Sequence, residues 1–146
     1  MRRQHGLPAL TWNAKLAEIG RGHSVDMARH GFFSHVDTRG LDPTARATKS
    51  GFACKKQVGS STYTGIGENL YMTGLYSRWH TTVTGTGTSS RVYDWKTLDE
   101  LALETVQAWM NSPGHRANLL DPKYDSEGIG IGISTDYNVY VTQDFC

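Results

Sequence analysis

Two stretches of the chain carry apolar residues at helical spacing, and each ends where a helix is expected to stop. The first runs from about residue 11 or 13 to His30, and Gly31 follows it. The second begins at Thr97, where the sequence Thr-x-x-Glu predicts a capping box, and continues to Asn111. Its buried face is expected to comprise Leu98, Leu101, Ala102, Thr105 and Trp109, with Glu104 at the edge of that face.

Three shorter segments carry helix boundary signals. Asp42 followed by Pro43 predicts a short helix through Lys49. Ser112 is a good N-cap and Pro113 suits the first helical position, so a further short helix is expected to run to Leu120. Residues 2–6 are interpreted as the last turn of a first helix that is clipped at the N-terminus.

The C-terminal part alternates apolar and other residues with the period of a strand. Residues 128–133 alternate glycine with isoleucine, residues 137–145 alternate as well, and the polar residues between them predict a hairpin. Residues 66–71 are expected to form a short strand or an extended turn, and residues 55–65 a loop. Residues 73–96 are expected to form an irregular loop insertion, mobile around the Thr/Gly/Ser tract.

Helices therefore lead and a small antiparallel sheet follows, which predicts an α+β sandwich with helices over the sheet faces. The 146 residues are expected to fold as one domain, 1–146. The net charge of +1 gives no reason to expect nucleic acid or an anionic membrane surface as a partner. No apolar run approaches the ~20 residues needed to span a bilayer. We expect the protein to be a monomer.

The two cysteines, Cys54 and Cys146, match no zinc-finger or CxxC spacing. They could be two buried free thiols or one long-range disulfide. We favour the disulfide, because it would anchor a terminal strand by its last residue. A disulfide implies an oxidising compartment. No signal peptide is present, so we expect an export signal to have been removed.

Four ionisable residues stand out by position: His35 ends an apolar turn, Glu68 interrupts an apolar segment, Glu104 borders a buried helix face and His115 lies at a helix start beside a glycine. Buried charged groups cost free energy unless they are paired or bind a metal. Two imidazoles and two carboxylates suit one another, and they also suit a cation such as Zn²⁺. The spacing alone is a weak signal, because there is no HExxH motif and the four residues lie on separate elements. The alternative is four unrelated polar residues.

Four segments in this order resemble the CAP superfamily, also called the SCP domain, of cysteine-rich secretory and pathogenesis-related proteins. They are residues 23–35 (HSVDMARHGFFSH), 65–71 (GIGENLY), 108–120 (AWMNSPGHRANLL) and 140–146 (YVTQDFC). The resemblance covers about residues 5–146 and implies a three-layer α-β-α sandwich with a small central sheet. It places His35, Glu68, Glu104 and His115 in a central cleft. There the imidazoles would hold a divalent cation, with Zn²⁺ expected and no organic cofactor, and the carboxylates would act directly or through water.

The resemblance implies a secreted or cell-surface module that recognises an extracellular ligand, whether lipid, glycan, peptide or protein. The alternative is a zinc-dependent, peptidase-like hydrolase in which Glu68 or Glu104 acts as general base. A third possibility is a structural domain with an empty cleft.

Several other polar residues near these motifs have expected places. Asn69, Gln143 and His80 are possible cleft-lining residues. His23 is expected in the core, and Asp37 and Arg46 are expected at turns or caps, with Asp37 near enough to His35 to orient it.

Overall fold

The computed structural model describes residues 1–146 as a mixture of helices and strands. In chain order the elements are η1 (Arg2–His5), β1 (Thr11–Trp12), α1 (Ala14–His30), α2 (Pro43–Lys49), β2 (Lys55–Val58), β3 (Ser61–Thr64), β4 (Gly67–Gly74), β5 (Tyr76–Val83), β6 (Ser89–Trp95), α3 (Leu98–Asn111), α4 (Pro113–Leu119), β7 (Ser126–Ile133) and β8 (Asn138–Phe145). No helix is both long and apolar enough to cross a membrane.

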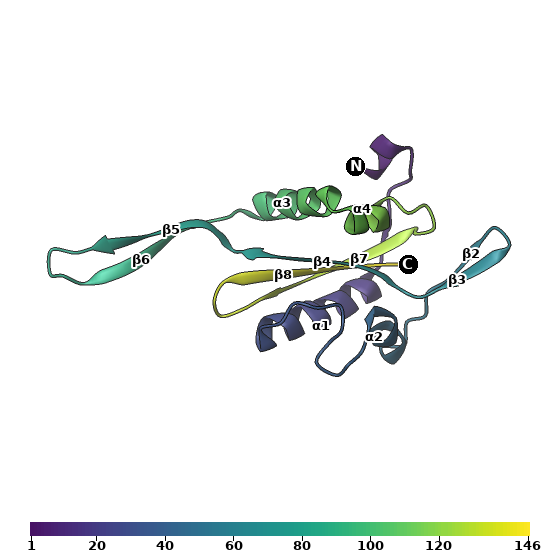
Figure 1. Ribbon diagram of the computed structural model, residues 1–146, viewed down its shortest axis with the longest axis horizontal. Coiled ribbons are helices and arrows are strands. Elements are labelled where there is room, and N and C mark those ends of the chain that lie inside the picture. The colour runs from purple at the N-terminus through teal and green to yellow at the C-terminus, as the bar shows by residue number, and fades with distance from the viewer.

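The body of the molecule has three layers, as predicted. Its central sheet has four strands in the order β1-β7-β8-β4. The β7–β8 and β8–β4 pairs are antiparallel, and the short β1 adds a parallel pair with β7. Helices α1 and α2 lie on one side of the sheet and α3 and α4 on the other (Figure 1). The hairpin predicted at the C-terminal end is confirmed as β7–β8, and residues 67–71 of the predicted strand or turn belong to a strand, β4.

The glycines of β7 let α1 lie directly on the sheet. An added Cβ at Gly130 would be 1.8 Å from the backbone nitrogen of Arg21, and one at Gly128 would be 2.1 Å from that of Ala17. Such distances leave no space for a side chain. The isoleucines between these glycines occupy the opposite face, because side chains alternate along a strand. The Gly-Ile repeat is thus a packing surface for α1 as well as a strand signal.

The predicted helix ends are mostly confirmed. The Asn13 side chain accepts hydrogen bonds from the first turn of α1, and Gly31 ends that helix with φ at 66°. The Thr97 capping box is complete. Ser112 is the N-cap of α4 as expected, but its side chain makes no capping hydrogen bond.

A disulfide joins Cys54 to Cys146, with 5.5 Å between the two Cα atoms, and confirms the favoured alternative. Both cysteines lie in a buried apolar cluster with Leu16 and Ile19 of α1. The bond ties the C-terminal residue to the segment that leads into β2.

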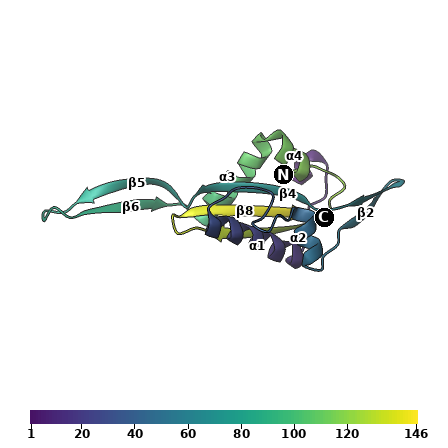
Figure 2. The same ribbon diagram turned by 60° about the horizontal axis from the view of Figure 1, so that its bottom comes forward.

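The two segments expected as loops are hairpins, so those expectations were wrong. Residues 55–64 form β2–β3 and residues 76–95 form β5–β6, each a separate two-stranded sheet. The hairpins project from opposite ends of the body (Figures 1 and 2). Threonine favours strands, and Gly87, with φ at 80°, allows the turn between β5 and β6. Because neither hairpin buries one face in the core, no apolar alternation marked them.

Candidate functional site

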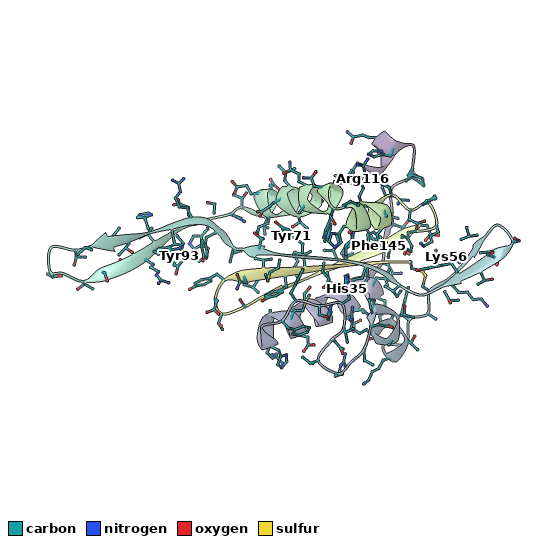
Figure 3. All side chains as sticks on the ribbon, in the orientation of Figure 1. His35, Lys56, Tyr71, Tyr93, Arg116 and Phe145 are labelled. Carbon is teal, nitrogen blue, oxygen red and sulfur yellow. A yellow bond between two sulfur atoms is a disulfide. The ribbon has the colours of Figure 1, made fainter.

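The candidate site is built around β4, which is an edge strand of the central sheet. Residues of β4 alternate between the two sheet faces. Glu68 pairs with Asp144 of β8, and Asn69 pairs with Gln143. Figure 3 shows His35 on the α1/α2 side of the sheet and Tyr71 on the α3 side. The strand therefore presents polar chemistry to both helical layers.

Glu68 is the buried centre of the α1/α2 side. Its Oε1 lies 2.7 Å from His35 Nδ1, and its Oε2 accepts a hydrogen bond from the Arg46 guanidinium. Arg46 also donates to the backbone oxygens of His35 at 2.7 Å and Leu41 at 3.1 Å. The Arg46 side chain is 3% exposed and that of Glu68 is 1% exposed. Glu68 thus links α2 to the segment that carries His35.

Asp144 is a second buried carboxyl group beside Glu68. It is fully buried, and no hydrogen-bond donor reaches either of its oxygens. Burial, followed by the negative charge of Glu68, raises the pKa of Asp144 well above its ordinary value. The carboxyl pair therefore favours holding a proton, with Asp144 as the protonated member.

Glu104 lies on the α3 side and has a separate set of partners. Its Oε1 accepts hydrogen bonds from the Tyr71 hydroxyl at 2.8 Å and the Thr73 hydroxyl at 2.9 Å. Its Oε2 lies 2.6 Å from Lys96 Nζ. Burial alone would raise the pKa of Glu104, but the hydrogen bonds from Lys96, Tyr71 and Thr73 outweigh it and lower that pKa. Glu104 is thus held as a carboxylate by an ammonium group of the same chain.

His115 lies in the first turn of α4, which is the third element that contributes to the site. Its backbone oxygen accepts a hydrogen bond from the fully buried Asn69 at 3.1 Å. The Asn118 side chain donates to Asn69 Oδ1 at 3.0 Å and to the backbone oxygen of Glu68 at 3.1 Å. Burial, followed by the charge of nearby His35, lowers the pKa of His115. The imidazole is therefore neutral near neutral pH.

The structure brings His35 and Glu68 into contact and puts His115 near His35, whereas Glu104 has its own partners. No group of three or more His, Cys, Asp and Glu side chains is placed to hold a metal ion. The donor set that remains is two imidazoles, with the Nδ1 of His35 held by Glu68. A four-residue ligand set does not form. Zinc binding stays a prediction.

The other predicted residues are placed as follows. His23 is buried, as expected. Gln143 is buried on the same face as Asn69 and hydrogen-bonds to it at 3.4 Å. His80 lies in β5, in the hairpin that projects from the body, and so does not cover the cleft (Figure 1). Asp37 is a turn residue, as expected, because its Oδ1 accepts hydrogen bonds from the backbone N–H groups of Arg39 and Leu41. Its Oδ2 binds the Arg39 guanidinium, and it does not bond to His35.

Sequence reasoning missed the two positively charged side chains of the site, Arg46 and Lys96. Arg46 was expected at a turn or cap, yet its guanidinium is the buried partner of Glu68. Lys96 directly precedes the capping box of α3 and is not among the predicted site residues. Nothing local indicated Lys96.

The comparisons with known proteins agree with this architecture. The family described as "CAP: Cysteine-rich secretory protein family" matches residues 1–145. An uncharacterized membrane protein of Bacillus subtilis, YlbC, is 28% identical over 145 residues, which are 99% of this chain and 31% of that protein. The chain thus spans about a third of that relative's length.

Solved structures give the same result. An extracellular protein containing an SCP domain, from Bacillus anthracis, is 25% identical with a TM-score of 0.60, over 99% of this chain and 35% of that one. An outer surface protein of Borrelia burgdorferi is 18% identical with a TM-score of 0.65, over 99% and 81% of the two chains. A cysteine-rich secretory protein from Staphylococcus aureus is 22% identical with a TM-score of 0.54, over 99% and 34%. The last two likenesses concern the fold alone.

Proposed function

This chain belongs to the CAP family of cysteine-rich secretory proteins, and from that premise we propose that it is an extracellular module that binds a ligand through its cleft without catalysing a reaction. Two observations support the location. The Cys54–Cys146 disulfide suits an oxidising compartment. The similar structures include a protein described as extracellular and one described as an outer surface protein.

The observation that carries the non-catalytic proposal is the pairing of both carboxylates with cations of the chain itself. The hydrolase alternative uses Glu68 or Glu104 as the proton acceptor for a water that the cation activates. Both oxygens of Glu68 are engaged, by His35 and by Arg46, in a buried setting. Glu104 has a lowered pKa because Lys96 and two hydroxyl groups bind it, which makes it a weaker base. Neither carboxylate is arranged as a general base.

A substrate screen tests this proposal against the hydrolase alternative. Peptide, ester and glycoside substrates are incubated with the protein loaded with Zn²⁺ and with the protein treated with EDTA. We expect no turnover that EDTA abolishes. Turnover that EDTA abolishes, that Zn²⁺ restores and that the Glu68→Gln or the Glu104→Gln variant lacks would refute the non-catalytic proposal. The exposed Glu18→Gln variant, whose carboxylate pairs only with Lys15 in α1, is the control.

The second candidate function is binding of a divalent cation by His35 and His115, and one specific contact favours it. Histidine ligands commonly donate their second ring N–H to a carboxylate, which fixes the tautomer and orients the free nitrogen. Glu68 stands in this relation to His35, with 2.7 Å between Oε1 and Nδ1. The lowered pKa of His115 keeps its imidazole neutral, as a ligand must be.

Calorimetric titration with Zn²⁺ at pH 7.5 tests this second candidate. We expect binding by the unaltered protein and its loss in both His35→Ala and His115→Ala. His30→Ala is the matched control, because His30 is exposed at the end of α1 and pairs with Asp26. Equal binding by the unaltered protein and by the variant lacking both His35 and His115 would exclude the two-imidazole site, and so would the absence of binding.

A further inference from the structure

The hairpin β5–β6 is a ribbon without support from the body along most of its length. Its strands Tyr76–Val83 and Ser89–Trp95 pair only with each other. Figures 1 and 2 show it projecting from the end of the body where α3 begins. An isolated two-stranded ribbon is marginally stable in water. Its side chains must therefore stabilise the ribbon, and their chemistry indicates what the ribbon can bind.

One face of this ribbon is aromatic. The register pairs Trp79 with Tyr93 and Tyr76 with Trp95, and paired residues share a face. The ring centroids of Tyr93 lie 4.9 Å from those of Tyr76 and 5.1 Å from those of Trp95. Figure 3 labels Tyr93 among the side chains of the projecting hairpin. We call the rings of Tyr76, Trp79, Tyr93 and Trp95 the aromatic face.

Tyr137 extends the aromatic face to the body. It lies in the turn between β7 and β8, and its ring centroid is 5.1 Å from that of Trp95 and 5.5 Å from that of Tyr93. Its φ is 61°, in the left-handed region that costs a non-glycine residue about 1 kcal/mol or more. A glycine would avoid that cost. A tyrosine at this position is explained by the contact of its ring with the aromatic face.

The aromatic face is not closed off from solvent. Trp79 is 47% exposed and Trp95 is 50% exposed. Arg91 lies over the Trp79 ring, with 4.8 Å from its Cζ to the ring centroid. Thr81 and Ser89 occupy the same face farther along the ribbon, as the register and the alternation of the strands require. The surface therefore combines accessible ring planes with hydroxyl groups.

The size of the ribbon limits what it can bind. The eight residues of β5 span ~26 Å, and two strands make a face ~10 Å wide, or ~260 Å². A partner in a standard protein interface contributes ~800 Å², about three times as much. The area of this face alone falls short of a standard interface with a folded protein or with a second copy of this chain. Its length and width suit a single extended polymer chain.

The few charged residues of the ribbon indicate which class of polymer it can bind. Arg78 is paired with Asp94 on the opposite face, at 3.3 Å, and Arg91 is the remaining formal charge between residues 75 and 95. Nucleic acids bind through several phosphate contacts with lysine and arginine, which this face lacks. Sugar rings have an apolar C–H face that stacks on aromatic planes and a rim of hydroxyl groups that hydrogen-bonds to threonine, serine and arginine. A neutral sugar polymer therefore matches both components of the surface.

We propose that the aromatic face of the β5–β6 ribbon binds a linear β-1,4-linked polysaccharide. Such a chain is extended, and its sugar rings present flat C–H faces. The half-exposed rings of Trp79 and Trp95 supply the stacking surface, while Arg91, which already lies over the Trp79 ring, meets the hydroxyl rim together with Thr81 and Ser89. The binding surface is separate from the cleft, so it depends neither on a cation nor on the state of Glu68 and Glu104.

The test uses the β-1,4-linked hexamer of N-acetylglucosamine as the probe, with tryptophan emission and calorimetry as readouts. We expect saturable binding with a shift in emission. The variants Trp79→Thr and Trp95→Thr should each weaken it at least ten-fold, the equivalent of about 1.4 kcal/mol. Threonine is chosen because it favours strands and so keeps the ribbon paired. Circular dichroism checks that the fold is retained.

Two control variants separate stacking from unspecific effects. His80→Thr alters the opposite face of β5, and Trp12→Ala removes an exposed tryptophan of the body. Both should bind the hexamer as the unaltered protein does. The proposal is overturned if the unaltered protein does not bind the hexamer, or if Trp79→Thr and Trp95→Thr bind it unchanged. Equal weakening by all four variants would overturn it as well.

Discussion

Replacement of Arg46 by methionine tests whether the buried ion pair holds the site together. The guanidinium is 3% exposed and donates to Glu68 and to the backbone oxygens of His35 and Leu41. Methionine keeps most of the apolar stem but leaves the Glu68 carboxylate buried without its cation. Breaking a buried pair in this way costs about 3–5 kcal/mol. Since a domain of this size is stable by about 5–15 kcal/mol, we expect a large loss.

The assay is urea-induced unfolding followed by near-UV circular dichroism at pH 7, with the disulfide intact. Arg78→Met is the matched control, because its pair with Asp94 is exposed and should be worth less than about 1 kcal/mol. The double variant Arg46→Met/Glu68→Gln removes both charges and should recover at least about 1.5 kcal/mol of the loss. The reasoning is refuted if Arg46→Met costs no more than Arg78→Met, or if the double variant is no more stable than Arg46→Met alone.

Three further predictions follow from other parts of the molecule. Replacing Cys54 and Cys146 by alanine opens a loop with a sequence separation of 92, so the free energy of unfolding should fall by about 4.6 kcal/mol; a fall below about 1 kcal/mol would contradict this. His115 should titrate below its ordinary value of 6.5 by NMR, so stability present above pH 6.5 should be lost as the pH falls through its lowered pKa. Gly130→Ala should lower the free energy of unfolding by at least about 3 kcal/mol, because its Cβ would meet the backbone of α1. Gly22→Ala, with open space around it, should raise that free energy by about 0.5–1 kcal/mol. Similar melting curves for the two variants would show the reasoning to be wrong.

The site could be predicted in part. His35 was predicted because it ends an apolar turn, Glu68 because it interrupts an apolar segment and His115 because it lies at a helix start beside a glycine, and the motifs around all three resemble those of a known family. Glu104 was placed at the edge of the buried face of α3, and the structure agrees: its side chain is 38% exposed. What the motifs did not indicate is that the two carboxylates have separate partners. That separation follows from Lys96 and Arg46, which come from segments with no recognised motif.

The sequence by itself determined the local elements of this protein. Helix caps at Asn13, Asp42 and Thr97 are side-chain hydrogen bonds to backbone a few residues away, and the alternation of β7 is a property of a single strand. Such features depend on neighbours in the chain, so they can be read from it.

Only the tertiary structure decided which charges meet. Lys96 reaches Glu104 from the base of the ribbon, and Arg46 reaches Glu68 across a gap of 22 residues. The strands β5 and β6 could not be predicted from the sequence either, because a ribbon with no buried face has no alternation of apolar residues. Coulombic partners and cross-strand pairs depend on distance in space, and the packing of α2 and of α3 against β4 set that distance for the two charge pairs.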